Sequence, residues 1–454
     1  MKNLLLLSFL FFSHLAFNQD TIKEEYEPAI KPRGYFRYAL PFSLNKAEIG
    51  YRLNLDGVGS IGGRHQEGDW LEIGTEMDLN RIMKWDIEPV IRLYTLFSMF
   101  PTTGTYMHLG TKIGIQEFYI TVDDTLKNTP FQFWAGTRYY RTNNIEACDY
   151  FNFNNLTGPS IGIKINHTQL ALITDAPFYN NEQGQYGTSF DRYRGRVIIA
   201  LQHQLQIGKK HKIDLLGEYH YAGWDVTHDS TGAQLTEGVD WGTVLGLRHH
   251  WQITPTLVNR VSVRRGWRIA NGPYDDNWSS RTFVSVGNPN AQDKFDGANA
   301  WHFTNNMQYT GSNLLNFEAY IVYRKAQGAE DAVEFDKTNN SKEDFTAGSR
   351  ITWFLSDMFH FITEGSYQVK KYTNYTSTKR KLSQGGTAAM SQFAIGPMYT
   401  PTGKRSMFTR PTFRLIYAIA FYNDYAIQER LSDYLLNVDN DVGHYLGIKT
   451  EFWF

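Results

Sequence analysis

The final stretch of the chain, residues 447–454, reads GIKTEFWF and alternates between apolar side chains and polar or amphipathic ones. Successive side chains of a β-strand point to opposite faces, so this alternation predicts a strand with one apolar face and one wet face. With the two residues before it, the stretch divides into an apolar set, Leu446, Ile448, Phe452 and Phe454, and a wet set, Tyr445, Lys449, Glu451 and Trp453.

The same alternation recurs along the whole chain, for example in residues 34–40, 70–78, 85–97, 212–221 and 410–421. A soluble β-sandwich alternates in the same way. Here, however, the polar face is often charged, and the strands approach the ~10 residues of a tilted transmembrane strand. Aromatic residues gather at strand ends, and short turns alternate with long polar connections. The pattern predicts an all-β fold, a transmembrane antiparallel β-barrel of about 18 strands.

The first residues form a separate segment. Residues 1–19, MKNLLLLSFLFFSHLAFNQ, carry one lysine, then an apolar run, then small and polar residues. This order is typical of a secretory signal peptide. The apolar run is shorter than the ~20 residues of a spanning helix, which argues against a membrane anchor. We therefore expect a signal peptide at residues 1–19 and an outer-membrane β-barrel channel at residues 20–454.

The composition argues against several other classes of protein. The chain has 45 basic and 46 acidic residues, so no excess of positive charge indicates nucleic-acid binding. The single cysteine, Cys148, excludes an internal disulfide and has no activating partners. His249 and His250 lack zinc-like ligand spacing, and Asp86 with Glu88 would be selectivity charges on a strand face rather than a hydrolase dyad. We expect no enzymatic activity, no metal and no cofactor.

One stretch does not continue the pattern of the wall. Residues 131–163 begin as an alternating strand, break into a loop rich in aromatic and amide side chains, and return through Gly158 and Pro159. The loop is too polar for a packed core and too aromatic for an idle connection, so we predict that it folds inward as the constriction of a channel. The glycine-rich residues 57–63 lack the lysine and helix of a phosphate loop, and we interpret them as an external loop.

Four stretches carry a resemblance to a known family. Residues 134–159, WAGTRYYRTNNIEACDYFNFNNLTGP, resemble the constriction-loop region of the maltoporins. Residues 34–37 resemble the first strand of that family, residues 410–414 a late strand, and residues 451–454 the C-terminus. The resemblance implies a trimeric, 18-stranded sugar channel of the bacterial outer membrane, and we expect it to cover the whole mature chain.

The resemblance also implies a set of sugar-binding residues. Aromatic rings would hold the apolar face of a sugar, while charged side chains would exchange hydrogen bonds with its hydroxyl groups. Two alternatives stay open at this point, because either Tyr150 or Phe151 could lie at the narrowing, and either Gln116 or Glu117 could face the interior. Arg265, followed by Trp267, stands where the family has a further stacking tyrosine. The expected aromatic slide comprises Tyr35, Trp70, Phe354 and Trp453, and the expected polar track and constriction comprise Arg37, Glu72, Gln116, Arg141, Asp149, Tyr150 and Phe151.

The function that the sequence favours is facilitated diffusion of maltose- and maltodextrin-type oligosaccharides by a homotrimer in outer-membrane lipid. The first alternative is a general diffusion porin, in which wall charges select solutes by size and sign alone. A barrel-borne hydrolase would need an activated nucleophile near the rim, and the sequence offers no convincing one. A soluble binding protein would have to dissolve without detergent once the signal peptide is removed.

Overall fold

The computed structural model describes residues 28–42, 51–64, 69–100, 112–126, 129–175, 196–222, 226–228, 234–236, 239–272, 285–287, 289–292, 294–331, 340–372, 376–377, 380–381, 385–438 and 440–454. The predicted signal peptide lies outside these residues. None of the helices in the described part of the chain has the length and apolar character needed to cross a membrane.

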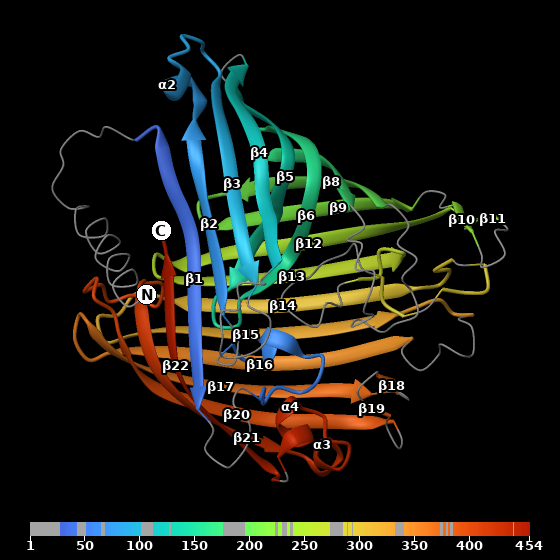
Figure 1. Ribbon diagram of the computed structural model, residues 1–454, viewed down its shortest axis with the longest axis vertical. Coiled ribbons are helices and arrows are strands. Elements are labelled where there is room, and N and C mark those ends of the chain that lie inside the picture. Colours follow the sequence, from blue (N-terminus) through green and yellow to red (C-terminus); the bar gives the residue numbers. More distant parts are fainter. Residues whose placement is uncertain are drawn as a thin grey trace.

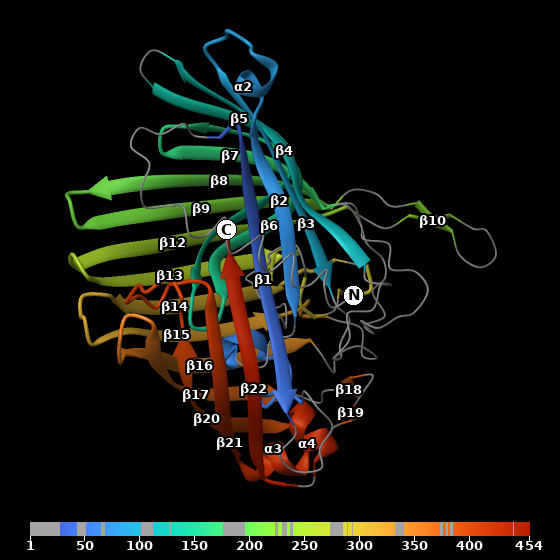
Figure 2. The same ribbon diagram turned by 60° about the vertical axis from the view of Figure 1, so that its left-hand side comes forward.

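In the described part of the chain, eighteen strands form one antiparallel sheet that closes on itself. Figures 1 and 2 show β1 between β2 and β22 in both views. The closure lies at β1, where Tyr35 is opposite Glu72 of β2 on one side and Trp453 of β22 on the other. The predicted barrel is therefore confirmed. Its strands are β1 (Ile30–Phe42), β2 (Trp70–Asp78), β3 (Val90–Phe100), β4 (Lys112–Leu126), β5 (Thr129–Ile145), β6 (Tyr150–Ile165), β7 (Thr168–Asp175), β8 (Arg196–Ile207), β9 (His211–Ala222), β12 (Asp240–Thr254), β13 (Leu257–Arg268), β14 (Asn299–Tyr309), β15 (Leu315–Gln327), β16 (Ser341–Phe354), β17 (Phe359–Tyr372), β20 (Gly386–Tyr399), β21 (Thr412–Tyr422) and β22 (Val442–Trp453).

Smaller elements lie in the connections between these strands. Short turns, such as residues 255–256 between β12 and β13, alternate with long connections such as residues 269–298 and 423–441. This asymmetry matches the short periplasmic turns and long external loops of outer-membrane barrels. The smaller elements are the hairpins β10 (Val226–His228) with β11 (Gln234–Thr236) and β18 (Thr376–Ser377) with β19 (Arg380–Lys381), and the helices η1 (Gly59–Gly62), α2 (Leu79–Met83), α3 (Asp424–Gln428) and α4 (Asp433–Asn437).

One predicted strand begins later than expected. The alternation from residue 85 predicts a strand that includes Asp86 and Glu88, but β3 begins at Val90. Residues 79–83 instead form α2, whose first turn is capped by the Asp78 carboxylate accepting a hydrogen bond from the Arg81 backbone N–H. Asp86 and Glu88 are exposed in the connection that follows the helix. The Asn80 side chain of the helix donates to the Pro89 carbonyl at 2.8 Å and accepts from the Ile91 N–H at 3.0 Å, so this connection is bonded to α2.

The predicted inward loop is a long hairpin made by β5 and β6. β5 pairs with β4 only as far as Thr137, and β6 pairs with β7 only from Ser160 onward. Beyond these points the two strands pair with each other alone and leave the wall. Gly136 lies at the departure point with φ of 125°, and a Cβ there would meet the Phe118 carbonyl oxygen at 2.3 Å. Only glycine suits this bend.

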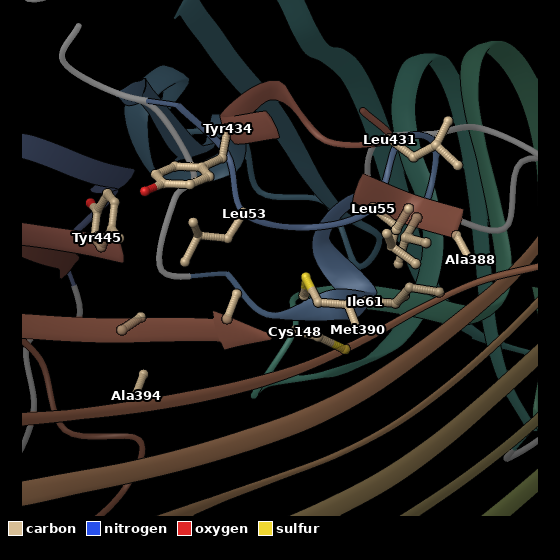
Figure 3. Close-up of a cluster of buried hydrophobic side chains, with 14 of the residues drawn as sticks. Leu53, Leu55, Ile61, Cys148, Ala388, Met390, Ala394, Leu431, Tyr434 and Tyr445 are labelled. Carbon is tan, nitrogen blue, oxygen red and sulfur yellow. The ribbon is translucent and has the colours of Figure 1, made fainter. Parts of the chain in front are cut away.

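The interior also holds residues 51–64, contrary to our interpretation of residues 57–63 as an external loop. Leu53, Leu55, Val58 and Ile61 are at most 1% exposed. They pack on the hairpin tip, on α3 and α4 and on the small side chains of the nearby wall, as Figure 3 shows for the central part of this cluster. Four apolar residues spaced among the glycines drive the segment inward, since leaving them in water would forfeit about 1.5–3 kcal/mol each.

Candidate functional site

Three neighbouring strands, β22, β1 and β2, bring three of the four predicted slide aromatics and two residues of the predicted polar track onto one face. Residues directly opposite each other in an antiparallel sheet share a face. The other parity of these strands carries Phe36 and Phe452, whose rings lie 5.8 Å apart on the outer surface. We call the inner set the three-strand face, and it consists of Tyr35, Arg37, Trp70, Glu72, Glu451 and Trp453.

The charge at the centre of this face is Glu451, whose carboxylate is 3% exposed. It accepts hydrogen bonds from Tyr35 Oη at 2.8 Å, from Arg64 at 3.1 Å and from Arg414 at 3.0 Å, and it is paired with Arg410 at 3.0 Å. A buried carboxylate needs such partners, because an unpaired charge out of water is strongly unfavourable. The four donors therefore hold the Glu451 carboxylate in place beside Tyr35.

The same arginines attach the hairpin tip to this wall. Arg410 reaches the Glu146 carboxylate at 2.9 Å, and Arg64 lies 3.7 Å from the Asp149 carboxylate. Burial raises the pKa of Glu146, against the opposing effect of Arg410 and Arg64. Burial also acts to raise the pKa of Asp149, but the charges of Arg64 and Arg37 outweigh it and lower the pKa. Asp149 is therefore held ionised at the tip.

The far side of the barrel holds the tip as well. Glu318 of β15 accepts hydrogen bonds from the Glu146 and Ala147 backbone N–H groups, and Arg350 of β16 donates to the Ala147 carbonyl at 3.0 Å. The backbone polar groups of this buried turn are satisfied by side chains of the wall, as buried backbone requires. Since the tip is linked to Glu451 of β22 through Arg64 and Arg410 and is bonded directly to β15 and β16, the hairpin crosses the interior.

The hairpin presents Arg141 between two aromatic rings. The guanidinium carbon lies 3.6 Å from the centre of the Tyr139 ring and 4.1 Å from that of Phe151. Tyr139 in turn donates a 2.6 Å hydrogen bond to Glu72 on β2. Cation–π contact on both sides holds the arginine, and the bond from Tyr139 to Glu72 keeps this group close to the three-strand face. We call Tyr139, Arg141 and Phe151 the hairpin sandwich.

Tyr150 and Phe151 lie in different surroundings, which bears on the alternative between them. Tyr150 is 1% exposed, its hydroxyl lies 2.9 Å from His302 Nε2 on β14, and its ring lies under Arg324 of β15. Phe151 is partly exposed and contacts Arg141. Tyr150 therefore anchors the hairpin to the wall, whereas Phe151 belongs to the sandwich that faces β2.

The alternative between Gln116 and Glu117 is resolved by an irregularity in the strand. The pairing of β3 with β4 shifts between Leu96 and Phe97, so that Gln116 is an extra residue in β4. Such a bulge lets two consecutive side chains point to the same side. Gln116 donates to Ser98 Oγ at 2.7 Å, and Glu117 pairs with Arg33 at 3.0 Å. Both side chains therefore face the interior.

The predicted stacking aromatics differ in how much of each ring is accessible. Trp453 is 45% exposed, with Arg410 4.2 Å from the ring centre, so part of its surface stays open. Trp70 is partly exposed. Phe354 is 6% exposed and packs edge-on against His360 beside the short turn that follows β16, with 4.8 Å between ring centres. Phe354 thus faces inward but lies covered, apart from the three-strand face.

Sequence reasoning missed Arg64. This arginine follows Gly62 and Gly63 in a segment that we expected outside the barrel, yet it bonds Tyr35, Glu451 and the Glu146 carbonyl and pairs with Asp149. Nothing in a lone arginine after two glycines marks it as a buried centre of charge. Only the apolar side chains at residues 53, 55, 58 and 61 could have indicated that the segment turns inward.

Comparisons with known proteins give one family. The family model described as LamB porin matches residues 30–454. Among curated proteins, none matches the chain.

Solved structures of outer-membrane proteins are also similar to the chain. OmpT of Vibrio cholerae, in its trimer form, is 8% identical with a TM-score of 0.44, over 94% of this chain and 99% of that one. OccK8 (OprE) of Pseudomonas aeruginosa is 12% identical with a TM-score of 0.42, over 94% and 98%. OprD of Pseudomonas aeruginosa is 9% identical with a TM-score of 0.42, over 94% and 93%. Likenesses this distant carry no argument about substrate or assembly.

Proposed function

The chain belongs to the LamB porin family, and on that premise we propose that it conducts maltose- and maltodextrin-type oligosaccharides by facilitated diffusion. It is a β-barrel porin of the bacterial outer membrane, and the resemblance to maltoporins is thereby confirmed. The proposal concerns what passes through the barrel and which side chains the solute touches.

The observation that carries the proposal is the three-strand face, on which aromatic and charged side chains alternate along each of the three strands. Trp453 is opposite Tyr35, and Arg37 is opposite both Glu451 and Trp70. A pyranose has an apolar face that stacks on a ring and a rim of hydroxyl groups that bond to charged side chains. The three-strand face offers stacking rings and charged side chains on adjacent strands. Such a surface suits a chain of sugars better than it suits a simple ion.

Trp453 is the best-placed stacking ring, since part of it is open while its environment fixes its orientation. The Arg410 guanidinium lies over the ring, and Arg410 is itself bonded to Glu146 and Glu451. A platform held this firmly loses little conformational entropy when a sugar binds. We assign Trp70 and Tyr35 to the same slide, and Phe354 only a supporting role beside the turn.

The hairpin sandwich supplies the opposite side of the proposed path. Tyr139 is bonded to Glu72, so the sandwich is tied to the polar track rather than separate from it. Arg141 and Phe151 then offer a donor and an apolar surface facing the three-strand face. Several weak and similar contacts along such a path allow a solute to enter without trapping it.

Liposome swelling tests the proposal against a general diffusion porin. Reconstituted protein should admit maltose and maltotriose faster than sucrose and raffinose, which have similar sizes. The Trp453→Ala variant should lose that preference. Trp353→Ala removes a tryptophan that is 38% exposed on the outer surface, and this matched control should keep it. Swelling rates that follow solute size alone, in all three proteins, would contradict the sugar-specific proposal and support a general diffusion porin.

Two further expectations belong to the same proposal. We propose that three copies assemble into a homotrimer, as the family resemblance implies, and that residues 1–19 direct export and are removed. Chemical cross-linking of the protein in membranes should give a trimer as its largest species. Sequencing of the mature N-terminus should start near residue 20. A monomer in the first measurement, or an intact N-terminus in the second, would contradict the respective expectation.

A further inference from the structure

Arg265 is an arginine on the outer surface of the barrel. Its neighbours directly across β12 and β14 are Leu245 and Trp301, which are 60% and 41% exposed. The preceding residue, Arg264, is 2% exposed and donates to the Phe153 carbonyl inside the barrel. Arg265 therefore faces the membrane, and it cannot extend the aromatic slide as a substitute for a tyrosine.

Two indole rings hold the Arg265 guanidinium without neutralising it. The guanidinium carbon lies 4.8 Å from the centre of the Trp267 ring and 4.6 Å from that of Trp301. Its Nε is buried and makes no hydrogen bond with the described residues, among which no carboxylate lies within ion-pairing distance. Arg268, three residues on, differs, because it pairs with Asp240 at 2.7 Å.

The depth of Arg265 in the membrane follows from its position in β13. The strand runs from the two-residue turn after β12 to the long connection at residues 269–298, and Arg265 lies close to that second end. One step closer to the middle of the barrel, Val263, Phe303 and Tyr323 face the lipid directly opposite one another. Long connections lie on the external side of such barrels, so Arg265 lies near the headgroups of the outer leaflet.

A second cation lies on the next strand but one. Lys325 of β15 is directly opposite Trp301, and its side chain is 53% exposed. Glu343 approaches it at 3.8 Å, at the edge of ion-pairing distance, and also accepts a hydrogen bond from Tyr323. Among the described residues, the Lys325 ammonium therefore has one carboxylate at the edge of ion-pairing distance, and the Arg265 guanidinium has none. We call Arg265, Trp267, Trp301 and Lys325 the outer cation patch.

We propose that the outer cation patch binds a phosphate group of an anionic lipid in the outer leaflet. A guanidinium presents parallel N–H donors that match two phosphate oxygens, and the indole rings hold it at the depth where phosphates lie. A membrane-facing arginine is unfavourable unless it reaches an anion or water, so an arginine at this position indicates such a partner. Charge complementarity favours a phosphorylated glycolipid over a second copy of the chain.

The test measures lipid retained by the full-length folded protein in a neutral detergent. Native mass spectrometry would follow titration with lipopolysaccharide and with the same lipid after enzymatic removal of its phosphates. Arg265→Gln should weaken binding of the phosphorylated lipid roughly tenfold to a hundredfold, the range expected for a lost charged hydrogen bond. The affinity of Arg265→Lys should lie between those of the wild type and Arg265→Gln, because lysine keeps the charge but lacks the paired N–H donors of a guanidinium.

Controls separate this site from general charge and from misfolding. Arg405→Gln removes a cation that pairs with Asp357 beside a short turn on the opposite side of the membrane, and it should bind lipid as the wild type does. Arg265→Gln should keep wild-type conductance, which shows that the barrel is intact.

Three results would overturn the proposal. The first is equal affinity of the wild type for phosphorylated and dephosphorylated lipid. The second is unchanged lipid binding in Arg265→Gln. The third is a loss of subunit association in that variant at constant lipid binding, which would make the patch a contact between copies.

Discussion

The Glu451→Gln variant probes the buried charge network that holds the barrel wall and the hairpin together. The wild-type carboxylate faces Arg64 at 3.1 Å, Arg410 at 3.0 Å and Arg414 at 3.0 Å, and these side chains are 1–6% exposed. Water therefore screens these pairs little. Removing one partner of a buried ion pair costs about 3–5 kcal/mol, because the remaining charge is left buried without compensation.

The other carboxylates near these three arginines decide how many buried charges the variant leaves unpaired. Arg410 keeps Glu146 at 2.9 Å and Arg64 keeps Asp149 at 3.7 Å, whereas the ion pair of Arg414 is with Glu451 itself. One buried arginine is thus left without its carboxylate, and two retain a substitute. We expect the free energy of unfolding to fall by about 3–5 kcal/mol, the cost of one such broken pair rather than three.

Urea unfolding of the protein reconstituted in lipid vesicles, followed by circular dichroism, would measure this change. The matched control is Glu343→Gln, which removes a carboxylate of the outer surface that is 35% exposed and 3.8 Å from Lys325. An exposed pair contributes about 0–1 kcal/mol, so the control should unfold almost as the wild type does. A loss below about 1 kcal/mol for Glu451→Gln would refute the reasoning, because the network would then contribute no more than a surface pair.

Three further changes test separate parts of the hairpin. Arg141→Ala removes the cation from the hairpin sandwich, so single-channel conductance in planar bilayers should rise, and an unchanged or smaller conductance would contradict its place at the narrowing. Tyr150→Phe removes the hydroxyl that lies 2.9 Å from His302; it should lower the urea midpoint by an amount equivalent to about 1 kcal/mol and leave conductance unaltered, whereas a large change of conductance would move Tyr150 into the path. Gly136→Ala places a Cβ 2.3 Å from the Phe118 carbonyl oxygen at a φ of 125°, so the yield of folded barrel on refolding should drop sharply, and refolding at the wild-type yield would show that the bend is not needed.

The barrel itself could be predicted because its strands are exposed to two different solvents. Lipid on one side and water on the other impose a period of two that is readable from the residues alone. This period assigns each residue of β1, β2 and β22 to the inner or the outer face. The pairing of the strands then places Tyr35 opposite Trp453. The family membership was also accessible from short motifs, since residues 134–159 carry them.

What could not be predicted depends on local irregularity and on contacts between distant segments. The bulge that turns both Gln116 and Glu117 inward depends on the partner strand, and a one-residue shift leaves no mark in the sequence. The late start of β3 accompanies hydrogen bonds between the Asn80 side chain of α2 and the backbone of Pro89 and Ile91. Arg64 gains its position from a carboxylate 387 residues away.

The choice between Tyr150 and Phe151 illustrates the same limit. Both are aromatic, adjacent and suited to a narrowing, so their chemistry alone does not separate them. The structure places Tyr150 against His302 and Arg324, two residues that come from strands far along the chain. Phe151 instead contacts Arg141, which lies on the neighbouring strand of the same hairpin.

The central claim is that sugars bind on the three-strand face as they pass. The measurement that tests it most directly is block of ion current through single channels in planar bilayers, titrated with maltose and longer maltodextrins. We predict saturable block whose affinity increases with chain length and decreases roughly threefold to tenfold in Trp453→Ala, the loss expected for one stacking contact. Open channels whose current the sugars leave unchanged at any concentration would contradict the account.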